Sequence, residues 1–183
     1  MLTPEQDDFY HRWLQKANHV NGHDVADLID EYVSLFIVYN FLYNIVPAER
    51  YRREGVRREY VKDMERATAH MVGFVGAKAM ANHLDAQGLN VGIKELADAM
   101  PHFNIVLDKG RPRKLQDERL ILELTSDDAL KMLAVMKILY HIRCNIVHGE
   151  KGLYQYQELL LLPALTLLRA IVVYLHDRLL EVR

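Results

Sequence analysis

Cysteine is almost absent from this sequence. Its 183 residues include one cysteine, Cys144, so no disulfide can form within the chain. Disulfides are typical of oxidising compartments, whereas chains without them are typical of reducing ones. The first ten residues, MLTPEQDDFY, are acidic and lack the apolar segment of a secretory signal. We therefore expect a cytoplasmic location.

The sequence also lacks a strong charge of one sign. Its 23 lysines and arginines are balanced by 25 aspartates and glutamates, which gives a formal net charge of -2. A protein that coats nucleic acid through its overall charge carries a large basic excess. Contact with RNA or DNA would therefore require a local basic patch.

Long uninterrupted hydrophobic runs are missing as well. The most apolar window, residues 159–175, contains Pro163 and Arg169. It is a little shorter than the roughly 20 apolar residues that a membrane-spanning helix needs. We expect a helix that is buried or contacts another subunit, and no membrane partner.

Several catalytic signatures are absent from the chain. The sequence contains no P-loop, no G-x-G-x-x-G turn and no G-x-S-x-G nucleophile motif, which leaves nucleotide-driven and serine-hydrolase chemistry without support. The zinc signature H-E-x-x-H is also missing among the nine histidines. The sequence therefore predicts neither a metal site nor a cofactor.

The pattern that is present is helical almost throughout. Thr3, Pro4 and Gln6 form the N-cap, first-turn proline and capping-box partner of a helix that should end near Lys16. Asp24 can cap a second helix, whose apolar residues recur at a spacing of three and four. Pro47 marks its expected end.

A third helix is expected to begin near Ala48 and to be divided at Gly55 or near Gly73 and Gly76. Residues 85–125 have the least clear pattern: a short helix is expected over LNVGIKELADAM, irregular chain over HFNIVLDKGRPRKLQ, and a short strand or helical turn over RLILEL. Thr125, Ser126 and Asp127 offer caps for a strong helix over residues 128–147. A last helix, in one or two pieces around Pro163, completes an all-α single domain spanning residues 1–183.

The end of the helix over residues 128–147 has an unusual composition, HIRCNIVHGEKG. On a continuous helix, His141, Asn145 and His148 share a face, and Arg143 lies about 140° from His148. Convergence of Arg143 and His148 would need the helix to end near Asn145, with Gly149 turning the chain, or a two-fold dimer that brings two copies together. An arginine and a histidine that converge suit a phosphodiester, since one binds phosphate oxygens and the other exchanges a proton near neutral pH. The alternative is that both side chains cap helix carbonyls.

The segment RCNIVH, at the end of a penultimate long helix, resembles the R-x4-6-H motif of the HEPN superfamily of helical domains. The segment FIVYNFLYNIV is similar to the N-x-L-Y region of Apea-like HEPN proteins, with Asn40, Leu42 and Tyr43 at the matching positions. The resemblance implies an antiparallel helical bundle of about five or more helices, with an irregular insert near residues 85–125. It also implies a homodimer whose paired motifs form a composite cleft.

Many members of that superfamily are metal-independent endoribonucleases, whereas others have lost activity or act as partners of nucleotidyltransferases. Arg143 and His148 match the two defining positions. Cys144 stands where active members often have a polar residue, and Glu150 stands where members paired with a nucleotidyltransferase antitoxin have a tyrosine. The first departure weakens the catalytic interpretation, and the second argues against that antitoxin system.

The resemblance implies RNA cleavage by the 2'-hydroxyl, which leaves a 2',3'-cyclic phosphate and a 5'-hydroxyl and spares DNA. His148 would transfer the proton and Arg143 would stabilise the charge on phosphorus. Asn145 or His141 would orient the substrate or His148. A toxin or defence setting, with an antitoxin or other partner protein, follows from the family alone. The alternative is a catalytically silent HEPN-like module that binds nucleotides, RNA or another protein.

Two basic runs are candidates for the RNA contact. The run from Arg50 to Arg58 has acidic residues four positions away, which a salt-bridged, solvated helix face explains. The second run lies in the predicted loop KGRPRK and lacks such partners before Asp117, so it is the better candidate. Its members are Lys109, Arg111, Arg113 and Lys114. Asn40 and Tyr43 are further RNA-binding candidates; Phe36, Tyr39 and Tyr43 could stack on bases, but their helical spacing favours core packing.

Overall fold

The computed structural model describes residues 2–20, 24–54, 61–147 and 155–181, and within these ranges it describes the side chains of all residues except 47–54 and 155. Helices make up most of the described chain, and the only strands found there form a two-residue-per-strand hairpin, so the all-α prediction is confirmed. In chain order the elements are α1 (Pro4–Asn18), α2 (Val25–Glu54), α3 (Asp63–Glu65), a π-helical turn (Arg66–His70), α4 (Met71–Val75), α5 (Ala77–Ala86), α6 (Asn90–Ala99), a 3-10 turn (Met100–His102), β1 (Leu107–Asp108), β2 (Arg111–Pro112), α7 (Lys114–Leu124), α8 (Asp128–Val147), a second 3-10 turn (Gln155–Gln157) and α9 (Glu158–Glu181).

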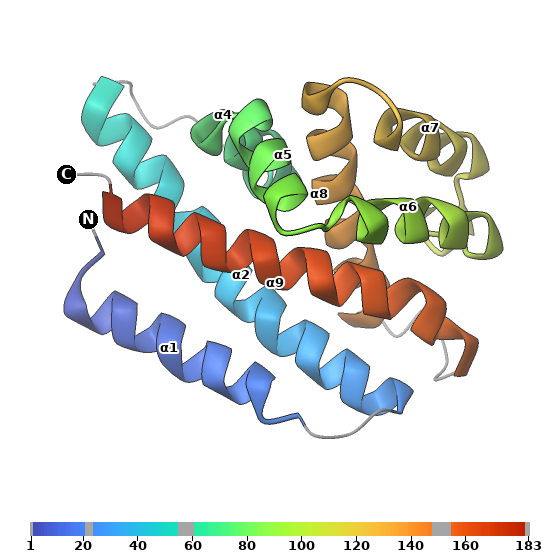
Figure 1. Ribbon diagram of the computed structural model, residues 1–183, viewed down its shortest axis with the longest axis horizontal. Helices are drawn as coiled ribbons and strands as arrows, with labels where there is room; N and C mark the ends of the chain where they lie inside the picture. The colour runs from blue at the N-terminus through green and yellow to red at the C-terminus, as the bar shows by residue number, and fades with distance from the viewer. Residues whose placement is uncertain (1, 21–23, 55–60, 148–154, 182–183) are drawn as a thin grey trace.

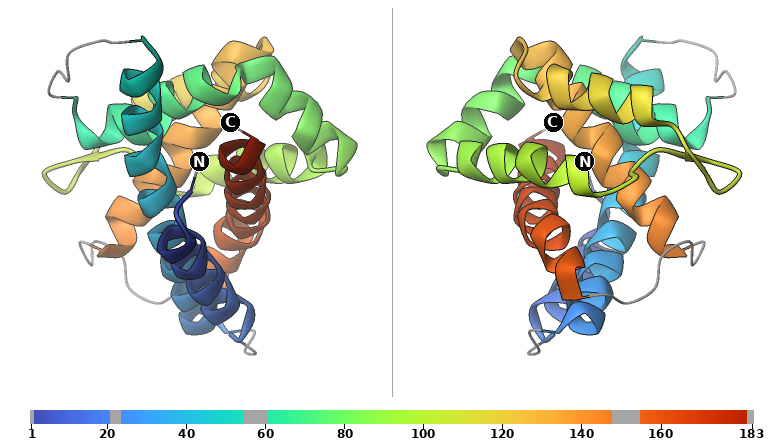
Figure 2. Two further views of the ribbon diagram at one scale, coloured as in Figure 1. Left: turned by 90° about the vertical axis from the view of Figure 1, so that its left-hand side faces the viewer. Right: turned by 90° about the vertical axis from the view of Figure 1, so that its right-hand side faces the viewer.

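The helices form two groups around one core. Helices α1, α2 and α9 lie side by side, and α2 packs against both α1 and α9 (Figure 1). Helices α4 to α8 lie across one side of the α2–α9 pair (Figure 2), where α6 contacts α9 and α8 contacts α5 and α7. Buried residues from both groups belong to a single hydrophobic cluster. This arrangement places α8 against α2.

The helix starts follow the capping signals in the sequence. The Thr3 hydroxyl accepts the Gln6 backbone N–H at 3.2 Å, and the Gln6 side chain accepts the Thr3 N–H at 2.8 Å, which is a complete capping box. Asp24 Oδ1 accepts the Asp27 N–H at 2.9 Å at the start of α2. Asp127 Oδ1 accepts the N–H groups of the second and third residues of α8, at 2.9 and 3.0 Å. The predicted start of α8 is therefore confirmed.

The prediction of a helix end at Pro47 is wrong. Helix α2 continues through Pro47 to Glu54, so residues 48–54 belong to α2 and do not begin a third helix. An interior proline removes one hydrogen bond and costs about 3 kcal/mol or more. The buried face of α2, which includes Tyr39, Leu42 and Val46, packs tightly enough to offset that loss. Pro163 is likewise buried inside an unbroken α9.

The charged-to-apolar stretch expected as a third helix consists of several short pieces. Residues 55–60, and with them the proposed division at Gly55, lie outside the described residues. The later division falls at Gly76, whose φ of +89° separates α4 from α5. The π-helical turn Arg66–His70 precedes α4, and the Tyr39 hydroxyl donates a hydrogen bond to the carbonyl of Ala67 within it.

The predictions for residues 85–125 are confirmed in part. The short helix expected over LNVGIKELADAM is α6, and residues 103–106 are irregular as expected, but residues 114–116 of the expected irregular stretch and RLILEL both belong to α7. Leu120, Glu123 and Leu124 are buried at the three-four spacing of a helix, whereas the exposed Leu122 obscures that period in the sequence. Asp117 orders the chain before the hairpin, because its carboxylate accepts the backbone N–H groups of Val106 at 2.8 Å and Ile105 at 3.3 Å.

Helix α9 is long and apolar enough to span a membrane by length and composition. However, 67% of its most apolar window is buried inside the fold. The Arg169 guanidinium, in the middle of the helix, binds Glu31 on α2 at 2.5 Å. Helix α9 therefore forms part of the protein core, as the position of Arg169 in the sequence predicts.

Candidate functional site

The last two turns of α8 contain the described part of the candidate motif. Arg143, Cys144 and Asn145 lie on this helix, which extends to Val147. His148, Gly149, Glu150 and Gly152 lie outside the described residues. The convergence of Arg143 and His148 therefore stays a prediction, and the described geometry concerns Arg143 and its neighbours.

Arg143 is half-buried and lies over an aromatic ring of α2. Its guanidinium carbon is 5.7 Å from the centre of the Phe36 ring, and its Nη1 is 3.9 Å from Cys144 Sγ. Among the described residues, no carboxylate lies within ion-pair distance of Arg143. A guanidinium held against a ring keeps its hydrogen-bond donors available for a phosphate, since stacking uses the flat face and not the N–H groups.

A polar cluster lies next to Arg143, between α2, α3 and α8. The Tyr43 hydroxyl donates to Asp63 Oδ1 and the Tyr140 hydroxyl donates to Asp63 Oδ2, both at 3.0 Å. Arg66 Nη2 also donates to Asp63 Oδ1, at 3.2 Å. We call Tyr43, Asp63, Arg66 and Tyr140 the Asp63 cluster.

The cluster and Arg143 interact electrostatically. Burial, followed by the hydrogen bond to Asp63, raises the pKa of Tyr43 and of Tyr140 well above the ordinary value of a tyrosine. Arg143 is close enough to both hydroxyls to oppose that rise in pKa. Both tyrosines therefore stay neutral near pH 7 and act as hydrogen-bond donors to Asp63.

A chain of amide contacts joins the cluster to Asn40. Arg66 Nη1 donates to Asn44 Oδ1 at 2.7 Å, and Asn44 Nδ2 donates to Asn40 Oδ1, also at 2.7 Å. Asn40 is half-buried, one turn before Tyr43 and Asn44 on α2. The structure thus brings Asn40, Tyr43 and Arg143, three of the residues singled out in the sequence, to the same contact between α2 and α8.

Asn145 and His141 occupy another face of α8. Asn145 is buried, and its Nδ2 donates to the carbonyl of Ile105 at 3.0 Å, which fastens α8 to the chain before the hairpin. At about 100° per residue, Asn145 lies about 160° from Arg143 around the helix. His141 is half-buried; burial, and then Lys137, lower its pKa. The side-chain nitrogen of Asn145 is therefore used inside the fold, and a role of Asn145 or His141 in orienting the substrate or His148 stays a prediction.

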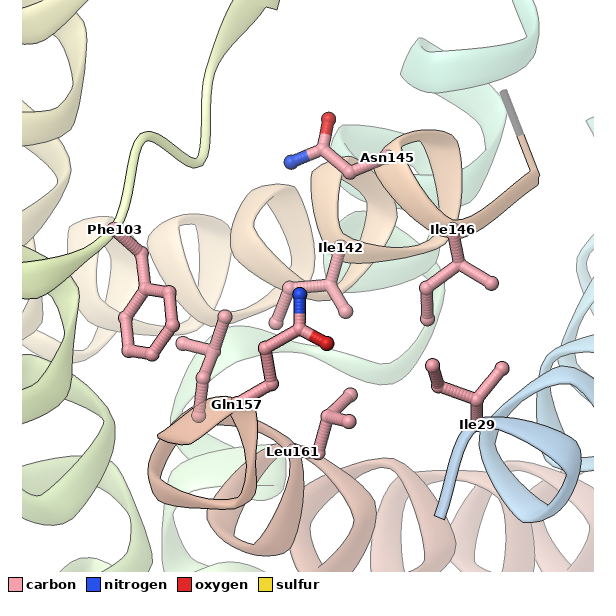
Figure 3. Close-up of a pocket in the computed structure, with 8 residues that line it drawn as sticks. Ile29, Phe103, Ile142, Asn145, Ile146, Gln157 and Leu161 are labelled. Atoms are coloured by element: carbon pink, nitrogen blue, oxygen red, sulfur yellow. The ribbon is translucent and has the colours of Figure 1, made fainter. Parts of the chain in front are cut away.

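A small pocket lies beside that face of α8. It has a volume of about 120 Å³, and Figure 3 shows Ile29, Ile142, Ile146 and Leu161 pointing toward one another across it. Phe103, Asn145, Gln157 and Leu160 complete its lining. The described part of this lining is mostly apolar and contains no charged side chain, so it suits an apolar group and not a phosphate.

The predicted basic loop is the β1–β2 hairpin, which projects from the helices (Figure 2). Lys109 and Gly110 form its turn, with φ of +51° and +75°. Arg113 pairs with Asp108, so the prediction that the run lacks an acidic partner before Asp117 is wrong: antiparallel pairing brings Asp108 next to the second strand. Lys109, Arg111 and Lys114 are exposed. The side chains of the run from Arg50 to Arg58 lie outside the described residues.

Sequence reasoning missed Asp63, Arg66 and Tyr140. Asp63 and Arg66 lie in VKDMER, which continues a run of charges typical of a solvated helix. A signal for Tyr140 was present, because it precedes Arg143 by three residues and therefore shares its face of α8. Core packing of Phe36 and Tyr39, by contrast, was predicted and is confirmed, since both side chains are buried.

The sequence predicted no metal site, but three side chains that could bind a metal ion lie close together in the fold. Asp7, His11 and His176 each present one ligand atom, and these atoms lie within 4.8 Å of one another. The group lies on α1 and α9, and it does not include Arg143 or the Asp63 cluster.

The chain was compared with models of known protein families, with curated proteins and with solved structures. None of the three comparisons gave a match.

Proposed function

We propose that this chain is a HEPN-like, metal-independent endoribonuclease that acts in the cytoplasm as a homodimer. Arg143 and His148 form its catalytic pair, and RNA is cleaved by its own 2'-hydroxyl. The observation that carries the proposal is the position of Arg143, which lies against the segment of α2 that contains Asn40 and Tyr43.

Two segments carry the sequence resemblance, and they are about 100 residues apart in the chain. In the fold they are joined by Asp63, which accepts hydrogen bonds from Tyr43 on α2 and Tyr140 on α8. Three residues after Tyr140, Arg143 lies over Phe36. If the two segments form one functional site, both are expected to resemble the same family, because the site needs residues from each of them.

The chemistry requires a fixed cation and a mobile proton. Arg143 is held by the Phe36 ring, and its N–H groups would bind the non-bridging oxygens of the phosphate, where charge increases in the transition state. His148 would take the proton from the 2'-hydroxyl or give one to the leaving 5'-oxygen. In a dimer, the two copies of His148 would divide these roles.

Exposed apolar residues lie within the motif and after it. Val147, the residue before His148, is 55% exposed, and Tyr156 and Leu159, which follow the motif, are 55% and 61% exposed. Apolar surface of this kind is typical of a protein contact, which supports a homodimer formed near the motif. The hairpin with Lys109 and Arg111 lies on the same side of the molecule as the C-terminal end of α8 (Figure 2), where it would bind the RNA backbone.

The test is cleavage of a structured RNA in EDTA, with a DNA of the same sequence beside it. We expect the wild-type protein to cleave RNA alone, and Arg143→Ala and His148→Ala each to lower the rate by about 100-fold or more. Arg178→Ala and His19→Ala are matched controls, because Arg178 pairs with Glu181 at the other end of α9 and His19 bonds the end of α1. Equal cleavage by all five proteins would reveal a contaminating nuclease and contradict the proposal.

A silent binding module is the second candidate function. The position of Cys144 favours it, because a thiol beside Arg143 replaces the polar residue that is usual in active members, and Arg143 Nη1 contacts it. This candidate predicts RNA binding that is weakened by Arg143→Ala without any cleavage by the wild-type protein. Binding without cleavage, measured by a gel shift in EDTA, would replace the first proposal with this one.

A further inference from the structure

The first turns of α1 and the last turns of α9 meet at one end of the molecule, where both chain ends lie (Figure 1). Asp7 and His11 are one turn apart on α1, and His176 extends from α9 toward both. Asp7 Oδ1 is 2.7 Å from His176 Nε2 and 3.6 Å from His11 Nε2. A carboxylate and two imidazoles form one of the donor sets found in zinc sites that have three protein ligands.

His176 is held rigidly in this group. Its side chain is 6% exposed, and its ring is stacked on Tyr10 with 3.6 Å between ring centres and 5° between ring planes. Its second nitrogen, Nδ1, lies 3.6 Å from Asp177 Oδ1. A histidine that ligates a metal usually directs its other nitrogen at a carboxylate or carbonyl, which fixes the tautomer and the ring orientation.

The local charge favours a cation. The carboxylate of Asp7 lies 2.7 Å from Nε2 of His176 and that of Asp177 lies 3.6 Å from Nδ1, so a carboxylate faces each nitrogen of this ring. The basic residue that follows His11, Arg12, pairs with Asp8 at 2.7 Å. Two carboxylates therefore lie against the imidazole of His176, and a divalent ion bound there would neutralise their negative charge.

We propose that Asp7, His11 and His176 bind a divalent cation of the zinc class, which fastens α1 to α9. In a tetrahedral site with ligands at 2.0–2.1 Å, neighbouring ligand atoms are roughly 3.4 Å apart. Asp7 and His11 can reach that spacing by side-chain rotation, because they are 40% and 62% exposed, while His176 stays in place. The metal takes Nε2 of His176, and the ring proton resides on Nδ1, facing Asp177. Water fills the fourth position on the exposed side of His11.

This site is independent of the proposed ribonuclease, since its ligands lie on α1 and α9 and Arg143 lies on α8. The hydrogen bond between Asp7 and His176 would by itself link the two helices without a metal. The two interpretations differ at His11, which contributes nothing essential to a simple helix-to-helix hydrogen bond but is one of three ligands to a metal.

The experiment is a titration of the full-length protein, stripped with EDTA and dialysed, with Co²⁺ and then Zn²⁺. We expect one equivalent of Co²⁺ to produce the visible absorption of a four-coordinate site, and Zn²⁺ to abolish it. His11→Ala and Asp7→Asn should each weaken Zn²⁺ binding by about 100-fold or more. Zn²⁺ should also raise the Tm of the wild-type protein and leave that of His11→Ala unchanged.

His19→Ala is the matched control, because His19 and His23 are the two histidines that lie four residues apart in the sequence. This variant should bind Zn²⁺ as tightly as the wild-type protein. The proposal is overturned if the wild-type protein binds no stoichiometric metal, if both ligand variants bind with unchanged affinity, or if His19→Ala alone abolishes binding. His11 and Asp7 are exposed, so their variants fold and keep the test decisive.

Discussion

Two residues in the same turn of α8 have opposite roles. Arg143 is held by a ring and a thiol and keeps its N–H groups free of any carboxylate among the described residues. Asn145 is buried, and its side-chain nitrogen holds the chain before the hairpin. The sequence predicted the importance of both, but it contains no sign that Asn145 would meet Ile105, because that contact joins residues 40 positions apart. Residue type and spacing identified the candidate residues, and tertiary packing assigned their roles.

His141 provides a prediction about pH. Burial and Lys137 lower its pKa, so the unfolded chain binds a proton more readily than the folded protein. The stability conferred by the neutral ring is present above the ordinary pKa of about 6.5 and is lost as the pH falls toward the lower folded value. His141→Gln removes this titration and keeps a polar side chain. We expect its urea midpoint to fall less than that of the wild-type protein between about pH 7 and pH 5.

The remaining pH dependence of that variant should come partly from His83, whose pKa is also lowered by burial. Identical changes in midpoint for the wild-type protein and His141→Gln would show that His141 titrates normally in the fold.

At the scale of elements, capping residues were better guides than helix breakers. The caps at Thr3, Asp24 and Asp127 begin helices where the sequence predicts them. Pro47 and Pro163 end no helix, because packing on the rest of α2 and α9 offsets the one hydrogen bond that each proline removes. Helix α7 was missed because its exposed Leu122 hides the helical period of its buried face. The spacing of apolar residues in the sequence does not show how deeply each side chain is buried in the fold.

Gly73 and Gly76 form a matched pair of sites within this part of the chain. Gly76 has a φ of +89°, where a side chain is strained, and it separates α4 from α5. We expect Gly76→Ala to lower the free energy of unfolding by about 1–2 kcal/mol. Gly73 lies inside α4, is exposed, and has no atom within 4 Å of an added Cβ. Gly73→Ala should therefore raise the free energy of unfolding by roughly 0.5–1 kcal/mol. Urea denaturation measures both.

The essential result is that the two substitutions change the free energy of unfolding in opposite directions. A Gly76→Ala protein as stable as the wild type would show that the chain does not need the left-handed conformation at this position.

At the scale of the whole molecule, the fold brings together segments that are distant in the sequence. The contact between α2 and α8 unites Asn40, Tyr43 and Arg143, and the contact between α1 and α9 unites Asp7 and His176, which are 169 residues apart. The family resemblance named the two segments of the first contact but did not predict that they meet. The second contact was not predicted either, because a single distant ligand has no spacing pattern to reveal it. The first contact joins the two helix groups, whereas the second lies within the group formed by α1, α2 and α9.

The most direct measurement of the central claim concerns the 2'-hydroxyl. The cleavage site is first mapped on a short RNA in EDTA, and the RNA is then synthesised with a single 2'-deoxynucleotide on the 5' side of that bond. The account predicts that the wild-type protein leaves this bond intact while cutting the all-RNA strand to a 2',3'-cyclic phosphate and a 5'-hydroxyl. Cleavage at the deoxynucleotide, or products with 3'-hydroxyl ends, would contradict the account.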